Sequence, residues 1–164
     1  MPNLPLPLIV FLALGLVLIL ALLITFLRPP SKLPYQCRPD FLTPAELVFF
    51  RALEQAVNNR FYIFAKVRIG DLLCVIEGTE NGGAWFGKIG QKHVDFMLAD
   101  RKDVRPVLVI ELDDSSHDLP HRQDRDAFVD EALKTAGLPI LRVTCAKDYA
   151  IPALEQSIRR ILPT

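Results

Sequence analysis

The sequence predicts an α/β domain with a mixed sheet, preceded by one transmembrane helix, and two observations predict this class. All 19 Lys and Arg and all 19 Asp and Glu side chains lie from Arg28 onwards, so an uncharged segment precedes one of ordinary globular composition. Within the charged segment, helical patterns alternate with short apolar runs. One such run, a helix and a second run follow one another as in a parallel crossover.

Residues 8–27 predict a transmembrane helix after a short tail of residues 1–7. Apart from Gly15 and Thr25, these 20 residues are aliphatic or Phe. At 1.5 Å per residue, such a helix crosses about 30 Å of hydrocarbon. The alternative is a secretory signal peptide, which would have a shorter apolar region, a basic residue before it and a small-residue cleavage site after it. We therefore expect a retained anchor in the lipid bilayer.

The flanking charges predict the orientation of this helix. No charged side chain precedes it, whereas Arg28, Lys32 and Arg38 follow it closely. Because the positive flank normally stays in the cytoplasm, we expect a single pass through the inner (cytoplasmic) membrane and a cytoplasmic domain. Three scattered cysteines without CxxC spacing agree with a reducing compartment. Four prolines make residues 28–40 an extended linker, and the domain occupies residues 41–164.

The first element of the domain is a helix predicted over residues 44–57. Thr43 supplies the capping side chain, Pro44 suits the first helical position and Glu46 completes a capping box. Apolar residues then recur at helical spacing. Residues 61–69 predict a strand, because they are rich in aromatic and branched side chains.

A loop and two further strands are predicted next. Residues 72–76 are ambiguous, and the glycine-rich residues 78–83 predict a turn or flexible loop. Residues 93–99 and 106–112 predict strands around a turn at 100–105. The second of these strands lacks alternation, which indicates burial on both faces in the middle of a sheet.

The C-terminal part completes the crossover. A helical stripe of apolar residues runs over residues 128–136, and Gly137 and Pro139 end it. Residues 140–143 predict another short buried strand, parallel to the preceding one. A final amphipathic helix carries its apolar side chains at Leu154, Ile158 and Ile161.

Three carboxylates form the candidate active site. Glu111 and Asp113 lie two apart, hence on one face, at the end of a buried strand, where α/β sheets place ligands. Asp95 lies among apolar residues on the neighbouring predicted strand, where an unpaired charge is costly. Such oxygen ligands suit Mg²⁺ or Mn²⁺, which activate water and neutralise phosphate charge. Alternatively, Asp113 belongs to a solvated turn and Asp95 pairs with a basic side chain. The candidate basic partners are Lys92, Arg105 and Arg142.

These motifs resemble the PD-(D/E)xK nuclease superfamily, whose restriction-endonuclease-like fold has an αβββαβ core. The acidic residues lie in "HVDFML" and "VLVIELDDSSH". More narrowly, "LTPAELVFFRALEQAV" and "RQDRDAFVDEALKTAGLPILRV" resemble a bacterial family of unknown function related to very-short-patch repair endonucleases. The resemblance covers residues 35–161. It implies Mg- or Mn-dependent hydrolysis of phosphodiester bonds in nucleic acid, with DNA favoured over RNA.

The resemblance also implies roles for individual residues. Asp95 and Glu111 match the two metal ligands, and the Leu112 carbonyl is the expected third. Glu46 matches an accessory acid, although the capping box alone explains a Glu there. Asp113 departs from the superfamily pattern, because a Lys usually stands at that position and steadies the attacking water. From its place on the strand, Asp113 remains a candidate metal ligand.

Basic residues follow the acidic cluster. From the resemblance to the repair endonucleases, His117 is the expected proton shuttle. His117 and His121 also have the spacing of a zinc pair, but Pro120 opposes a continuous helix through both. Arg122 and Arg125 are candidates for phosphate contacts. Their alternative is pairing with acids on the exposed helix face. Those acids are Asp124, Asp126 and Asp130.

Net charge confines nucleic-acid binding to a local patch. The formal net charge is +0, so the chain lacks the basic field of a non-specific DNA binder. Lys66, Arg68, Lys88 and Lys92 are the candidate patch. Residues 82–87 are either a base-stacking loop or a hydrophobic plug. The alternative function is a catalytically inactive binding or scaffold module of the same fold, tethered to a membrane complex. The sequence does not identify protein partners.

Overall fold

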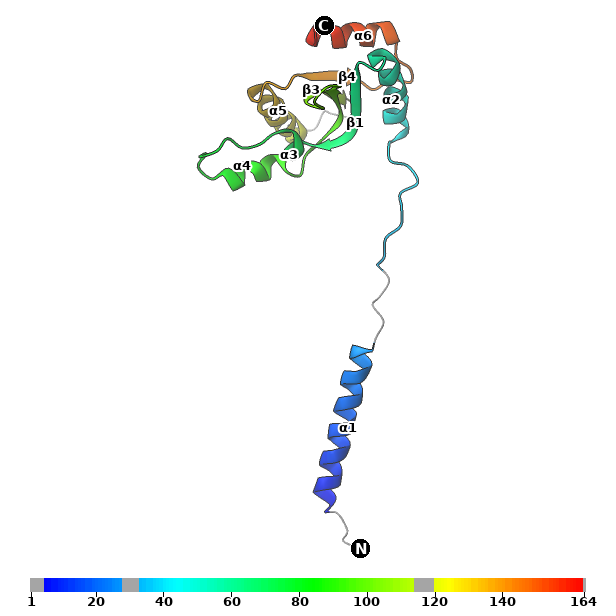
Figure 1. Ribbon diagram of the computed structural model, residues 1–164, viewed down its shortest axis with the longest axis vertical. Helices are drawn as coiled ribbons and strands as arrows, with labels where there is room; N and C mark the ends of the chain where they lie inside the picture. The colour runs from blue at the N-terminus through cyan, green and yellow to red at the C-terminus, as the bar shows by residue number, and fades with distance from the viewer. Residues whose placement is uncertain (1–4, 28–32, 114–119, 164) are drawn as a thin grey trace. The chain divides into compact units, whose positions relative to one another are not determined.

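The computed structural model describes residues 5–27, 33–113 and 120–163, and the chain divides into two units (Figure 1). Residues 1–39 form the first unit and residues 40–164 the second. In residues 120–126 the helical backbone is described, but the side chains are not.

The first unit contains helix α1, Leu6–Phe26. It has 21 residues and contains an 18-residue window with a mean hydropathy of 3.2, which is enough in length and composition to cross a membrane. A signal sequence has the same two properties. The apolar helix predicted from the sequence is therefore present, one to two residues from the expected bounds.

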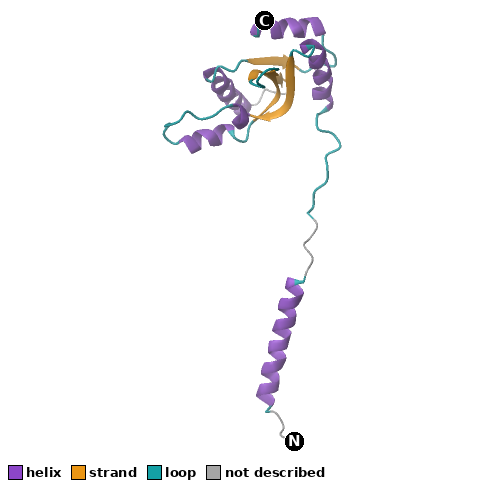
Figure 2. Cartoon of the chain, in the orientation of Figure 1, coloured by secondary structure: helices purple, strands orange, loops and turns teal. Residues whose placement is uncertain are grey.

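The second unit is built on a four-stranded mixed sheet with flanking helices (Figure 2). The strands are β1 Phe61–Arg68, β2 His93–Asp100, β3 Pro106–Asp113 and β4 Ile140–Thr144. They lie in the order β1-β2-β3-β4, with two antiparallel pairings followed by the parallel pairing of β3 with β4. The helices are α2 Pro44–Val57, α3 Ile69–Leu72, α4 Gly82–Ile89, α5 Pro120–Thr135 and α6 Ile151–Ile161.

Local chemistry explains where α2 begins and ends. The Glu46 N–H donates to the Thr43 hydroxyl, and the Thr43 N–H donates to the Glu46 carboxylate at 2.8 Å, which completes the predicted capping box. Asn58 ends the helix in the left-handed conformation, with φ of 44°. The predicted bounds of this helix are confirmed.

Two apolar clusters flank the sheet. The first joins α2 and α6 to side chains such as Phe96 and Ile110, and the second joins α3, α4 and α5 to side chains such as Val94 and Val109. All members of both clusters lie within residues 42–162. The second unit therefore has a complete core of its own, which allows it to fold without α1.

At Lys66, the side chains of β1 and β2 change from the first apolar cluster to the second. Ala65 and its partner Phe96 belong to the first cluster, whereas Val67 and its partner Val94 belong to the second. Between them Lys66 adopts a φ of 54°, which is uncommon for a residue with a Cβ atom. This conformation turns the strand, so the side chains beyond it face the α5 side of the sheet.

Helix α4 corrects one prediction. Residues 82–87 were considered as either a base-stacking loop or a hydrophobic plug, and the turn or loop predicted over 78–83 included Gly82 and Gly83, but residues 82–89 lie in a helix. Phe86 explains the difference, because a Cβ atom at Gly70 would lie 3.3 Å from its ring and one at Gly90 would lie 3.2 Å away. Phe86 thus packs closely against both glycines, and this tertiary contact overrides the low helix propensity of the segment.

Candidate functional site

Asp95 and Glu111 face each other from neighbouring strands. The antiparallel register pairs Phe96 with Ile110 and Met97 with Val109, so the next step places Asp95 opposite Glu111. The Leu112 N–H donates a 2.8 Å hydrogen bond to the Asp95 carboxylate. Both acids are partly buried, on the face of the sheet that carries Val109.

The surroundings of this pair favour the protonated form of Glu111. Burial raises the pKa of Glu111 to about 8, with further contributions from the charge of Asp95 and a hydrogen bond between the two carboxyl groups. The charge of Arg142 acts in the opposite direction. At neutral pH the Glu111 carboxyl therefore keeps its proton and donates it to Asp95. The neighbouring carboxylate that contributes to this rise is Asp95.

Asp113 lies in an ion pair with Arg142. The guanidinium contacts Asp113 at 2.8 Å and Asp130 of α5 at 2.7 Å. Burial opposes the charge of Arg142, but these two carboxylates outweigh it and raise the pKa of the guanidinium. The expected convergence of three carboxylates is not formed, and no group of three metal-binding side chains gathers within the described residues. The role of Asp113 as a metal ligand stays a prediction.

The alternative considered for Asp95 was an ion pair with Lys92, Arg105 or Arg142. Among the described contacts, Asp95 accepts from the Leu112 backbone rather than from any of the three basic residues considered for it. Of these residues, Arg142 binds Asp113 and Asp130, and Arg105 lies 3.9 Å from Asp103. The third, Lys92, lies near the Phe128 ring.

Glu46 has a structural partner that the sequence did not reveal. Lys66 Nζ lies 2.6 Å from Glu46 Oε1, and Lys66 lies in β1 between Ala65 and Val67, whose partners in β2 are Phe96 and Val94. Burial would raise the pKa of Glu46, but hydrogen bonds from Lys66 and Thr43 outweigh it and lower the pKa. The left-handed conformation of Lys66, which the sequence pattern does not signal, accompanies this contact. The accessory role of Glu46 stays a prediction beside its capping role.

The remaining candidates are only partly described. His117 lies outside the described residues, and His121, Arg122 and Arg125 lie in the first turns of α5, where the side chains are not described. The described part of helix α5 begins at Pro120, and the predicted interruption between His117 and His121 falls on residues outside the described part. Lys88 lies on α4 with its ammonium 4.1 Å from the centre of the Trp85 ring.

Comparison with known proteins places the chain in a family without assigning a reaction. No curated protein and no solved structure matches it at a significant level. One family model matches residues 38–161, which include the whole sheet and its helices α2 to α6. The chain belongs to this family, described as "Protein of unknown function (DUF2726)".

Proposed function

We propose that this protein is a membrane-anchored nuclease whose cytoplasmic domain hydrolyses phosphodiester bonds of nucleic acid with Mg²⁺ or Mn²⁺. The observation that carries the proposal is the Asp95–Glu111 pair, two partly buried carboxyl groups that face each other from β2 and β3. The resemblance of the surrounding motifs to PD-(D/E)xK nucleases supports the same reaction. DNA is the favoured substrate, as that resemblance implies.

The chemistry of the pair fits a divalent cation. Two facing carboxylates repel each other when both are ionised, so a partly buried pair needs either a proton or a cation between its members. Oxygen donors are the ligands that Mg²⁺ and Mn²⁺ prefer. Such an ion, when bound, supplies an activated water and neutralises charge on the phosphate. The Leu112 carbonyl is proposed to complete the donor set.

The chain's own residues have distinct proposed tasks. Asp95, held by the Leu112 N–H, is preorganised, whereas Glu111 must lose its proton before it can bind a cation. His117 is proposed to shuttle a proton, and Arg122 and Arg125 to contact the phosphate backbone. With Lys88 and Lys92 they would provide the local basic patch that a chain of net charge +0 requires.

One observation favours a second candidate, a catalytically inactive scaffold module of the same fold. Arg142 holds Asp113, and its positive charge is balanced by Asp113 and Asp130 together, which leaves it unsuited to bind phosphate. In that case the Asp95–Glu111 pair is a remnant of a metal site. The two candidates differ in whether a bound metal ion supports turnover.

Metal titration and cleavage by one soluble fragment, residues 33–164, distinguish the candidates. We expect calorimetry to detect Mn²⁺ binding, and DNA to be cleaved with Mg²⁺ but not in EDTA. Asp95→Asn and Glu111→Gln remove ligand charge, so both should abolish binding and lower cleavage at least about a hundredfold. Glu54→Gln, on the exposed face of α2, is the matched control. Thermal unfolding checks that each variant is folded.

Two further variants test the proposed roles of Asp113 and His117. Asp113→Asn should weaken Mn²⁺ binding if Asp113 leaves Arg142 to become a ligand, and should leave it unchanged otherwise. His117→Ala should slow cleavage with little change in Mn²⁺ affinity, because a shuttle acts after the ion is bound. Mn²⁺ binding without cleavage of DNA or RNA would favour the scaffold. Cleavage in EDTA, or full activity of both ligand variants, would exclude the metal-dependent reaction.

A further inference from the structure

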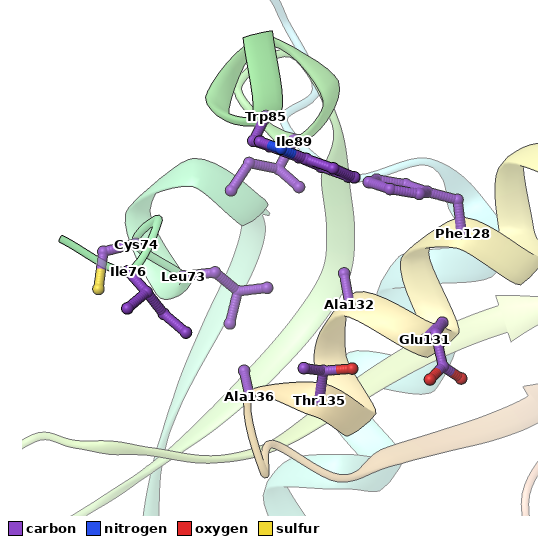
Figure 3. A pocket seen from close by; sticks show the side chains of 10 residues that line it. All are labelled: Leu73, Cys74, Ile76, Trp85, Ile89, Phe128, Glu131, Ala132, Thr135 and Ala136. Atoms are coloured by element: carbon purple, nitrogen blue, oxygen red, sulfur yellow. The ribbon is translucent and has the colours of Figure 1, made fainter. Parts of the chain in front are cut away.

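A pocket of about 340 Å³ opens between α4, α5 and the segment that follows α3 (Figure 3). Its aliphatic lining comes from Leu73, Ile76, Ile89, Ala132 and Ala136. In Figure 3 the rings of Trp85 and Phe128 are seen edge-on, one beyond the other, along one side. The Asp95–Glu111 pair is not part of this pocket.

Small residues on α5 create the hollow. Ala132 and Ala136 lie one helical turn apart and both face the pocket, while Leu133 beside them is fully buried in the core. The opposite wall stays partly uncovered, because Trp85 is 47% exposed and Ile76 is 79% exposed. A longer side chain at either alanine would reach into this space. The pocket therefore offers apolar surface that no described part of the chain covers.

Two ammonium groups stand beside the aromatic wall. Lys88 Nζ lies 4.1 Å from the centre of the Trp85 ring and 5.8 Å from that of Phe128, and Lys92 Nζ lies 6.0 Å from the latter. No described carboxylate forms an ion pair with either lysine. Glu131, which also lines the pocket and lies beside Phe128 on α5 (Figure 3), is 3.9 Å from Lys134. The rings and lysines thus form a wall with positive charge and no described acidic partner.

We propose that this pocket binds the hydrocarbon chain of an anionic single-chain amphiphile, with the anionic head at Lys88 and Lys92. The volume lies at the lower end of small-ligand pockets, and the lining is mostly aliphatic. A nucleic-acid base fits less well, because most of its polar edge would face apolar groups and lose hydrogen bonds. A membrane-spanning α1 would keep the domain close to a source of such ligands.

Trp85 is the only tryptophan of the chain and therefore reports on the pocket. With the soluble fragment, residues 33–164, we expect dodecanoate to shift the Trp85 emission to shorter wavelength in a saturable manner. From octanoate to dodecanoate, affinity should rise up to about fourfold per added methylene, the equivalent of ~0.8 kcal/mol each, until the pocket is full. Dodecanol, without a charge, should bind more weakly.

Variants separate the pocket from the charge. Ala132→Phe fills the hollow and should weaken dodecanoate at least tenfold, whereas Ala127→Phe, at an exposed position of the same helix, should not. Lys88→Gln should weaken dodecanoate by about fivefold and leave dodecanol unchanged, as expected for an exposed charge contact. Lys102→Gln, in the turn between β2 and β3, is its control. Thermal unfolding confirms that each variant is folded.

The source of the ligand is tested separately. If bilayer lipids enter the pocket, vesicles containing anionic phospholipid should shift the Trp85 emission. If bilayer lipids do not enter, free dodecanoate should shift the emission and the vesicles should not. Either result supports the site. The proposal is overturned if dodecanoate leaves the emission unchanged, or if Ala132→Phe binds like the unchanged fragment. The proposal is also overturned if the fragment does not bind dodecanoate but binds single-stranded DNA or a second copy of itself, and Ala132→Phe blocks that binding. Activity at Asp95 and Glu111 is not part of this test.

Discussion

Glu111 and Asp95 face each other across β2 and β3, and a hydrogen bond joins their carboxyl groups. The Leu112 N–H fixes Asp95 from the backbone of the same strand that carries Glu111. Burial and the neighbouring charge place the pKa of Glu111 at about 8. The pair is therefore a proton-binding site in the folded domain, and its protonation depends on pH and on the charge of Arg142.

The stability of the metal-free domain should fall as pH rises from 6 to 9. The folded state binds the Glu111 proton more tightly than the unfolded state, where the pKa is near 4.5. The resulting stabilisation is complete below pH 4.5 and is lost as pH rises through about 8. We expect the free energy of unfolding to fall by about 1–3 kcal/mol across this range. Urea unfolding of the soluble fragment in EDTA measures it.

Glu111→Gln is the matched control, because an amide has the shape of the protonated acid and does not titrate. The variant should keep most of the stability at pH 9 that the original fragment loses. Glu46, Asp71 and Asp100 have lowered pKa values and stay ionised throughout the range, so they do not contribute to the slope. Parallel pH profiles for the fragment and Glu111→Gln would contradict a raised pKa at Glu111.

Metal binding to the pair should release a proton. Because Glu111 is protonated at neutral pH, a cation that binds both carboxylates must displace that proton. We expect about one proton released per Mn²⁺ at pH 7 and almost none at pH 9.5. Calorimetry in two buffers with different ionisation enthalpies gives this number. Mn²⁺ binding with no proton release at pH 7 would place the ion elsewhere in the domain.

Arg142 should hold the pKa of Glu111 down while it ties β4 to α5. Its charge opposes the rise in the pKa of Glu111, and its guanidinium joins Asp113 to Asp130. Arg142→Met should therefore move the pH midpoint of the stability profile upwards. Because all three side chains are partly exposed, we expect a loss of only about 0.5–2 kcal/mol. The double variant Arg142→Met, Asp113→Asn should recover part of it, and additive losses would show that the pair is uncoupled.

Local signals in the sequence were sufficient for most of the helices and strands. The capping residues of α2 and the apolar run of β3 are properties of a few neighbouring residues, so their positions could be predicted closely. Helix α4 could not, because it depends on Phe86 packing against Gly70 and Gly90. Such contacts form only when the chain has folded.

In the candidate site, too, some contacts could be predicted from the sequence and others depend on the folded structure. That Asp95 and Glu111 would meet followed from their places on two neighbouring strands, and the register agrees. The partner of Asp113 did not follow, because Arg142 reaches it only through the parallel pairing of β3 with β4 and the position of Asp130 on α5. Strand alternation placed Asp113 on the face of Glu111, but it did not reveal which charge would neutralise it.

The orientation of α1 can be tested independently of the domain's chemistry. Arg28, Lys32 and Arg38 follow the helix and no charged side chain precedes it, so the domain should remain in the cytoplasm. In a bacterial host, a β-galactosidase reporter fused after Thr164 should be active, and alkaline phosphatase at the same place should not. Three lysines inserted before Leu8 should erode this difference, whereas three glutamines should not. N-terminal sequencing of the membrane fraction should find α1 intact. Active alkaline phosphatase would reverse the orientation, and a chain that begins after residue 27 would identify α1 as a cleaved signal sequence.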